Sequence, residues 1–80
     1  MSMVNSIDIT KAFSVSLRHY RLQKGLTQEE LADGVGLDRT YISMLERAIK
    51  SPSLRSMHLI ACQLEVPLAE IISHAEAQLK

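Results

Sequence analysis

The chain has 80 residues, enough for one domain with a single hydrophobic core and too few for most large enzyme folds. Apolar residues make up 46% of the chain and charged residues 22%, a balance that favours a folded core over disorder. Nine Lys and Arg balance nine Asp and Glu, so the chain as a whole lacks the basic excess that is usual in nucleic-acid-binding domains.

The charge is unevenly distributed along the chain. Residues 9–58 hold eight basic side chains against five acidic ones, and the remainder of the chain carries the compensating acidic excess. A basic segment of this kind is compatible with a nucleic-acid partner, although the net charge is zero.

Several other classes of protein are disfavoured. The apolar runs are shorter than the ~18 residues of a membrane span, and the N-terminus lacks the pattern of a secretory signal, so we expect a cytoplasmic protein that has no membrane partner. Cys62 has no second cysteine to pair with, and His19, His58 and His74 lack zinc-site spacing. No nucleophile elbow surrounds any serine. We therefore expect no metal, no cofactor, no small-molecule ligand and no enzyme activity.

Helical periodicity fills the intervals between short breaks in the chain. The first helix is expected from about Ile9 to Lys24, where Gly25 supplies the stop. Thr27 and Glu30 have the spacing of a capping box, which predicts the start of a second helix of about seven residues. The glycine-rich run 34–36 ends that helix in a tight turn.

Three further helices follow the turn. Asp38 is a suitable N-cap for a third helix that runs to about Arg47. The segment 51–53 opens a fourth helix, which ends near Leu64, with either serine as its cap, and Pro67 falls in the first turn of a fifth. The sequence therefore predicts an all-α fold of five short helices.

Residues 28–47 are spaced as in two helices that cross steeply after a tight turn. Ala32 is small enough to allow close approach, and Gly36 can adopt a positive φ in the turn. Apolar residues that would hold the pair on a shared core recur through the segment: Leu31, Val35, Leu37, Ile42 and Leu45. This spacing indicates a helix-turn-helix whose second helix keeps one face open.

Placing the third helix at 100° per residue divides its side chains into two sets. The inward set is Ile42, Leu45 and Ile49, and the outward set is Thr40, Ser43, Met44 and Arg47, flanked by Arg39 and Tyr41. Arg39 can present two parallel donors to guanine, the Thr40 methyl group can pack on thymine, and Ser43 can donate or accept. We interpret these three as base contacts rather than as a solvated helix face.

Other polar residues are suited to the DNA backbone or to the fold. Arg47, Lys50 and Ser51 lie beyond the base-reading turn, and Gln28 begins the second helix, so we expect all four to contact phosphates. Arg21 and Glu46 both lie within the apolar arcs of their helices. That position favours an ion pair between the first and third helices over contact with DNA.

The segment TQEELADGVGLDRTYISMLER, Thr27 to Arg47, resembles the helix-turn-helix of lambda-repressor-like, XRE-family regulators, and the likeness extends from Leu17 to Ile72. The strings LDRTYIS, LER and LEV are most similar to the small controller proteins of restriction-modification systems. The resemblance implies a five-helix lambda-repressor-like domain over residues 1–80 and a homodimer that binds a two-fold operator. It also implies DNA contacts by these residues: Arg39 and Thr40 to bases, with Gln28, Tyr41, Ser43 and Lys50 at other contact positions.

Two positions depart from the family pattern. Ala48 stands where glycine or asparagine is usual, so the exit from the third helix is expected to differ, and Met44 is bulky where the controllers commonly have a small residue.

The fourth and fifth helices carry more apolar surface than so small a core requires. Leu54, Met57, Ile60, Ala61 and Leu64 form the expected core arc of the fourth helix. Leu59 points nearly opposite to that arc. We therefore hypothesise an isologous dimer interface formed by Leu59, Val66, Leu68, Ile71 and Ile72. The alternative is that the fifth helix only closes the core of one chain.

Taken together, these features predict a sequence-specific, homodimeric transcriptional regulator, and the resemblance implies a restriction-modification controller. It would bind an approximate inverted repeat of double-stranded DNA through the major groove. Two alternatives remain open: an antitoxin-type protein-interaction module and a phage-type repressor.

Overall fold

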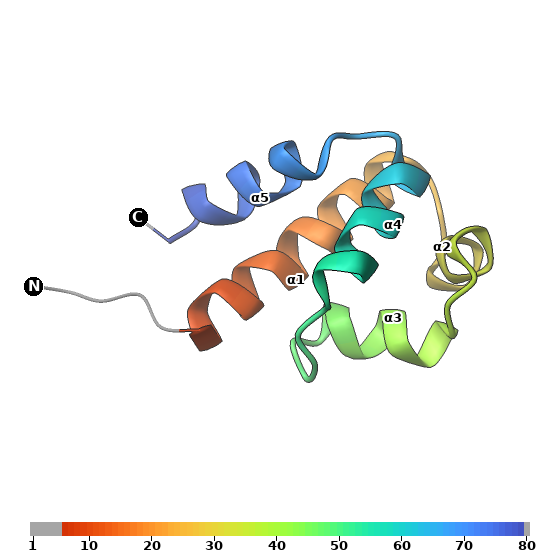
Figure 1. Cartoon of the computed structure of the whole chain (residues 1–80), viewed down its shortest axis with the longest axis horizontal. Coiled ribbons are helices and arrows are strands. Elements are labelled where there is room, and N and C mark those ends of the chain that lie inside the picture. Colours follow the sequence, from red (N-terminus) through yellow and green to blue (C-terminus); the bar gives the residue numbers. More distant parts are fainter. Residues whose placement is uncertain (1–5, 80) are drawn as a thin grey trace, which may run out of the picture.

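The computed structural model describes residues 6–79 and contains five α-helices and no strand in this part of the chain. The helices are α1 (Ser6–Gln23), α2 (Gln28–Val35), α3 (Arg39–Glu46), α4 (Leu54–Leu64) and α5 (Leu68–Ala77) (Figure 1). The predicted all-α architecture is confirmed. Within the described residues, no helix has the length and apolar character needed to span a membrane.

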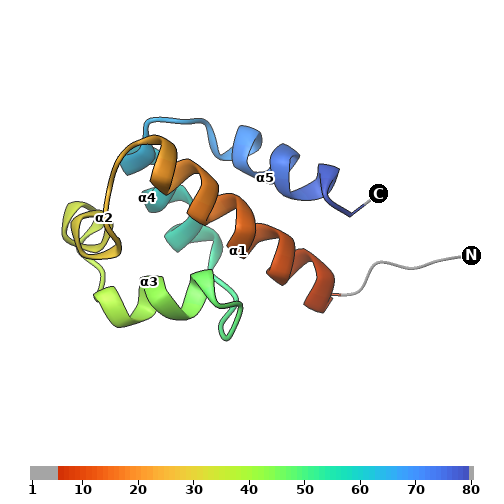
Figure 2. The same cartoon turned by 180° about the vertical axis from the view of Figure 1, so that it is seen from behind.

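The longest helix, α1, lies between α5 and α3, and the other helices are arranged around it (Figures 1 and 2). α5 runs back along α1 in the opposite direction, while α4 packs against both α5 and α2. α2 and α3 contact each other at the end of the molecule remote from the C-terminus. This arrangement places α3 at the edge of the molecule in both views.

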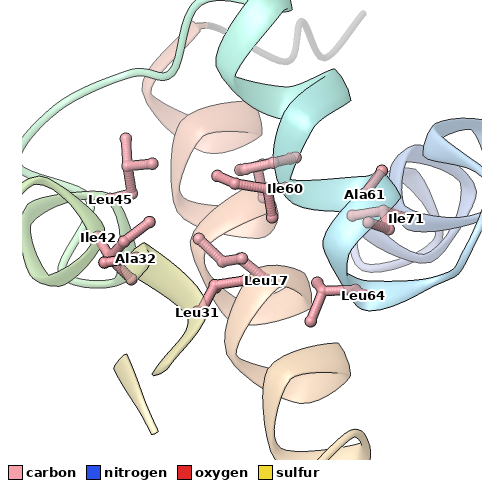
Figure 3. Close-up of a cluster of buried hydrophobic side chains, with 10 residues drawn as sticks. Leu17, Leu31, Ala32, Ile42, Leu45, Ile60, Ala61, Leu64 and Ile71 are labelled. Atoms are coloured by element: carbon pink, nitrogen blue, oxygen red, sulfur yellow. The ribbon is translucent and has the colours of Figure 1, made fainter. Parts of the chain in front are cut away.

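Every helix contributes to one hydrophobic core (Figure 3). The largest apolar side chains that are fully buried are Leu17, Leu31, Ile42, Leu45, Ile60 and Ile71. Helices of eight residues, such as α2 and α3, are marginal in isolation. Their stability therefore comes from the contacts of Leu31, Ile42 and Leu45 with the other helices.

The start and end of α2 are fixed by local chemistry, as predicted. The Thr27 hydroxyl accepts a hydrogen bond from the Glu30 backbone N–H at 3.0 Å, and the Glu30 carboxylate accepts one from the Thr27 backbone N–H at 2.8 Å. At the other end, Gly36 adopts the left-handed conformation with φ of 73°. A glycine reaches this conformation without the strain that a Cβ would add.

The next three helices also begin at identifiable caps. The Asp38 carboxylate accepts from the Thr40 backbone N–H at 2.8 Å, which confirms Asp38 as the cap of α3. The Ser53 hydroxyl accepts from the Ser56 backbone N–H at 3.0 Å, which settles the choice between the two serines in favour of Ser53. Pro67 occupies the N-cap position of α5 rather than its first turn.

Two predicted core residues are instead exposed. Ile49 is 60% exposed because α3 ends at Glu46 and Ala48, with φ of 58°, turns the chain away from the helical path. Leu54 is 71% exposed. It is the first residue of α4 and precedes by one turn Met57, which packs against the core.

The contact between α1 and α5 includes a polar and aromatic cluster. The buried Ser16 hydroxyl lies 2.7 Å from His74 Nδ1, and the His74 ring stacks on His19 with 4.5 Å between centroids. Tyr20 packs edge-on against both histidine rings. Burial raises the pKa of the Tyr20 hydroxyl above its usual value, and the hydrogen bond and negative charge of Glu70 raise it further.

Candidate nucleic-acid interface

α3 has one face in the core and one face directed away from the rest of the molecule. Ile42 and Leu45 are fully buried and hold the inner face against the other helices. On the outer side, the Arg39 and Thr40 side chains are exposed and Ser43 is half-buried. The three predicted base-contact residues therefore lie on the accessible side of α3, and α3 projects at the edge of the molecule (Figure 1).

The inner side of this region is fixed by the ion pair that the sequence predicted between α1 and α3. Arg21 Nε donates to Glu46 Oε2 at 2.5 Å, and Arg21 Nη2 donates to Glu46 Oε1 at 2.9 Å. The two side chains are only 9% and 4% exposed. Arg21 Nη1 also donates to the Leu26 carbonyl oxygen at 2.7 Å. The pair therefore joins α1, the turn after it and the end of α3.

Gln28, the first residue of α2, extends this network toward the surface. Its side-chain amide Nε2 donates to Glu46 Oε1 at 3.1 Å. Gln28 and Arg39 line the same surface hollow, together with Thr27, Glu29 and part of Arg21. The structure thus brings a predicted backbone contact and a predicted base contact together where α2 and α3 begin.

Three features of this region were not predicted from the sequence. Thr27 and the exposed acid Glu29 line it beside Gln28. Thr27 and Glu29 are the sequence neighbours of Gln28, so their position beside it in the hollow could have been predicted. The hydrogen bond between Gln28 and Glu46 joins residues 18 positions apart, and no local pattern indicates it.

Tyr41 is placed differently from the other expected contact residues. Its side chain is half-buried and packs against the core, and its hydroxyl donates to the Ser56 hydroxyl at 3.2 Å. Ser56 also accepts from the Ser53 hydroxyl at 3.0 Å. Because a phosphate oxygen can only accept, the Tyr41 hydroxyl would have to turn away from Ser56 to bind DNA.

The remaining predicted backbone contacts follow α3. Arg47, Lys50 and Ser51 are all exposed, and the Ser51 hydroxyl forms a hydrogen bond of 3.0 Å with the Thr10 hydroxyl on α1. α3 has eight residues and is about 12 Å long, so Arg47, the residue that follows it, lies at the opposite end of the helix from the hollow. The candidate contacts thus lie at both ends of α3 and in the segment that follows it.

The residues expected at a dimer interface separate into two groups. Leu59, Val66, Leu68 and Ile72 are half-buried in the single chain. Ile71 is fully buried in the chain's own core, and its place in the interface is a wrong prediction. The apolar pattern of α5 identified Ile71 as inward-facing, but the inner face of α5 packs on α1 and α4 of the same chain.

The described residues contain no group of three or more His, Cys, Asp or Glu side chains placed to hold a metal ion. Cys62 is exposed on α4, where its sulfur lies 3.7 Å from His58 Nε2.

A family model described as helix-turn-helix matches residues 17–71, which include all of α2, α3 and α4. The chain belongs to the helix-turn-helix family. The matching model is that of the XRE type, the type that the sequence resembles.

A control protein and a transcriptional repressor are similar to this chain over most of its length. The control protein C.MunI of Mycoplasma sp is 35% identical over 72 residues, covering 89% of this chain and 97% of that protein. The cryptic phage CTXphi transcriptional repressor RstR of Vibrio cholerae is 33% identical over 67 residues, covering 84% of this chain. This chain spans only 60% of the length of that repressor.

A solved helix-turn-helix structure has a closely similar fold. The restriction-modification controller protein C.Esp1396I, determined as a tetramer in complex with its natural 35 base-pair operator, matches with a TM-score of 0.81. The two chains are 37% identical, and the match covers 90% of this chain and 96% of that one.

Proposed function

We propose that this protein is a sequence-specific DNA-binding transcriptional regulator that acts as a homodimer in the cytoplasm. The observation that carries the proposal is the exposure of Arg39 and Thr40 on a helix whose opposite face is fully buried. A helix held in this way can enter the major groove of B-DNA, where each base pair presents a distinct pattern of donors and acceptors.

The proposed base contacts come from the first two turns of α3. The Arg39 guanidinium would donate to O6 and N7 of guanine, and the Thr40 methyl group would pack against the thymine methyl group. Ser43, one turn after Thr40, would donate to or accept from a neighbouring base edge. Two copies of α3 in successive major grooves would read half-sites about 34 Å apart, so the operator would be an approximate inverted repeat.

The proposed backbone contacts are Gln28, Tyr41, Arg47, Lys50 and Ser51, of which only Arg47 and Lys50 are positively charged. Each neutralised phosphate contributes about −0.9 to the slope of log affinity against log salt. Two charged contacts per chain therefore imply a shallow salt dependence and weak binding to random DNA. Dimerisation would then supply much of the operator affinity.

The proposed dimer interface consists of Leu59, Val66, Leu68 and Ile72, four half-buried apolar residues of α4, α5 and the turn between them. An isologous interface uses the same patch on both copies, as a two-fold operator requires. The operator complex of the similar controller C.Esp1396I, which contains a tetramer, supports assembly of this kind.

We further propose that the regulated system is a restriction-modification system, because the chain matches C.MunI over nearly the whole length of that control protein. The similarity to the phage repressor RstR favours a second candidate, a phage-type repressor that would use the same α3 contacts. The genes next to this one distinguish the two: a restriction endonuclease and methyltransferase, or phage functions.

The base-contact assignment is tested by Arg39→Ala, with Arg18→Ala at an exposed position of α1 as the matched control. The duplex is one selected by the wild-type protein from a random pool. We expect Arg39→Ala to lose about 1–3 kcal/mol on this duplex and little on scrambled DNA. Arg18→Ala should change neither affinity. Equal losses by Arg39→Ala on both duplexes would reassign the residue to the DNA backbone.

A further inference from the structure

Met44 is an apolar side chain on the outer face of α3. It lies four residues after Thr40, so the two side chains follow each other along the same side of the helix. The inner face is formed by Ile42 and Leu45, which are fully buried. Met44 is half-buried, but among the described residues it is not one of the partly buried apolar side chains that pack against the core, as Tyr41 is. The hydrophobic core therefore does not include Met44.

The backbone of Met44 is fixed, although its side chain lies outside the core. Its carbonyl oxygen accepts from the backbone N–H of Ile49 at 2.9 Å and from that of Lys50 at 3.4 Å. These bonds close the turn that follows α3, in which Ala48 adopts φ of 58°. The side chain is thus presented at a defined place, and its unbranched chain can adapt to the surface that it meets.

Met44 differs in chemistry from the other side chains of this face. The other outward side chains of α3 and of the residue after it carry hydrogen-bond donors: Arg39, Thr40, Ser43 and Arg47. The Met44 thioether is only a weak acceptor, and covering the polar edge of a base without pairing it costs free energy. The apolar feature that the major groove offers is the 5-methyl group of thymine, and 5-methylcytosine carries a methyl group at the same ring position.

We propose that Met44 is a specificity-determining residue that recognises the 5-methyl group of a pyrimidine, in thymine or in 5-methylcytosine. The inference rests on the proposed function, because it requires α3 to lie in the major groove. Four residues of helix advance by about 6 Å, and successive base pairs are about 3.4 Å apart. Met44 therefore contacts a different base pair from Thr40, and each residue reads its own methyl group.

The experiment changes single methyl groups of the DNA. In the duplex selected by the wild-type protein, each thymine of one half-site is replaced in turn by uracil, which leaves the hydrogen-bonding edge unchanged. Each cytosine is replaced in turn by 5-methylcytosine, which adds the methyl group. At one position we expect the wild-type protein to bind the base with the methyl group about fourfold more tightly, the effect of burying one methyl-sized group, and Met44→Ala to bind both bases equally. The series in which this position occurs identifies the base as thymine or as 5-methylcytosine.

Three further variants separate this effect from other causes. Met44→Gln keeps a side chain of similar length but makes its end polar, and it should also lose the preference. Thr40→Ser removes only the methyl group of Thr40 and should leave the preference that depends on Met44 unchanged. Leu22→Ala, at an exposed apolar position of α1, is the matched control and should keep every ratio. Each ratio compares two duplexes bound by the same protein, so a lower folded fraction cancels.

The inference is overturned if Met44→Ala and Met44→Gln keep the wild-type ratio at every position, whatever their loss of affinity. A preference that Thr40→Ser removes at the same position would also overturn it, because Thr40 would then read that methyl group. Failure of the proposed function is seen separately, as a wild-type protein that does not prefer the selected duplex over scrambled DNA.

Discussion

Replacing Glu46 with alanine tests how strongly the fold depends on the pair that joins α1 and α3. The Arg21 and Glu46 side chains are 9% and 4% exposed. Glu46→Ala would therefore leave the Arg21 guanidinium charge buried and without its ion-pair partner. Removal of one partner of a buried pair costs about 3–5 kcal/mol. The total stability expected for 80 residues is about 4–12 kcal/mol. We therefore expect Glu46→Ala to remove a quarter or more of the free energy of unfolding.

The measurement is urea unfolding followed by circular dichroism, with a double variant and a surface control. The variant that combines Arg21→Met with Glu46→Leu removes both charges and should recover most of the loss, because no unpaired charge stays buried. Lys24→Ala breaks the exposed pair with Glu65, whose side chains are 38% and 71% exposed, and should cost at most about 1 kcal/mol. A Glu46→Ala loss as small as the Lys24→Ala loss would refute the reasoning.

Three further outcomes are expected. Ala48→Gly should raise the free energy of urea unfolding by up to about 1 kcal/mol, since Ala48 has φ of 58°; an unchanged or lower value would contradict this. The raised pKa of Tyr20 means that the unfolded chain releases this proton first, so stability should fall as pH rises above about 10, and less steeply in Tyr20→Phe. A thermal midpoint with the same alkaline slope in both proteins would oppose that assignment. Leu59→Glu should weaken self-association in sedimentation velocity while helix content is kept; a variant that stays dimeric would move the interface elsewhere.

The local features of the fold could be predicted because they depend on residues close in sequence. Thr27 and Glu30 cap α2 through side chains three positions apart, and Asp38 caps α3 through a backbone group two positions away. Their chemistry is the same whatever the rest of the chain does. The helix-turn-helix spacing is likewise contained within residues 28–47.

The wrong predictions concern residues whose local sequence pattern is overridden by the backbone conformation or by tertiary packing. Ile49 fits the periodicity of α3, but the left-handed conformation of Ala48 breaks that periodicity before it. The pattern of α5 shows that Ile71 is inward-facing but cannot show whether the surface it meets belongs to its own chain or to a second copy. The bond between Gln28 and Glu46 depends on how α2 and α3 cross, which no spacing in the sequence specifies.

The central claim is that the outer face of α3 reads a two-fold DNA sequence. The most direct test is selection of bound duplexes from a random pool, followed by measurement of the number of chains on the selected DNA. We expect an inverted repeat with half-sites about 34 Å apart, bound by two chains or a multiple of two. A pool that converges on no sequence, or a selected duplex bound no better than its scrambled counterpart, would contradict the claim.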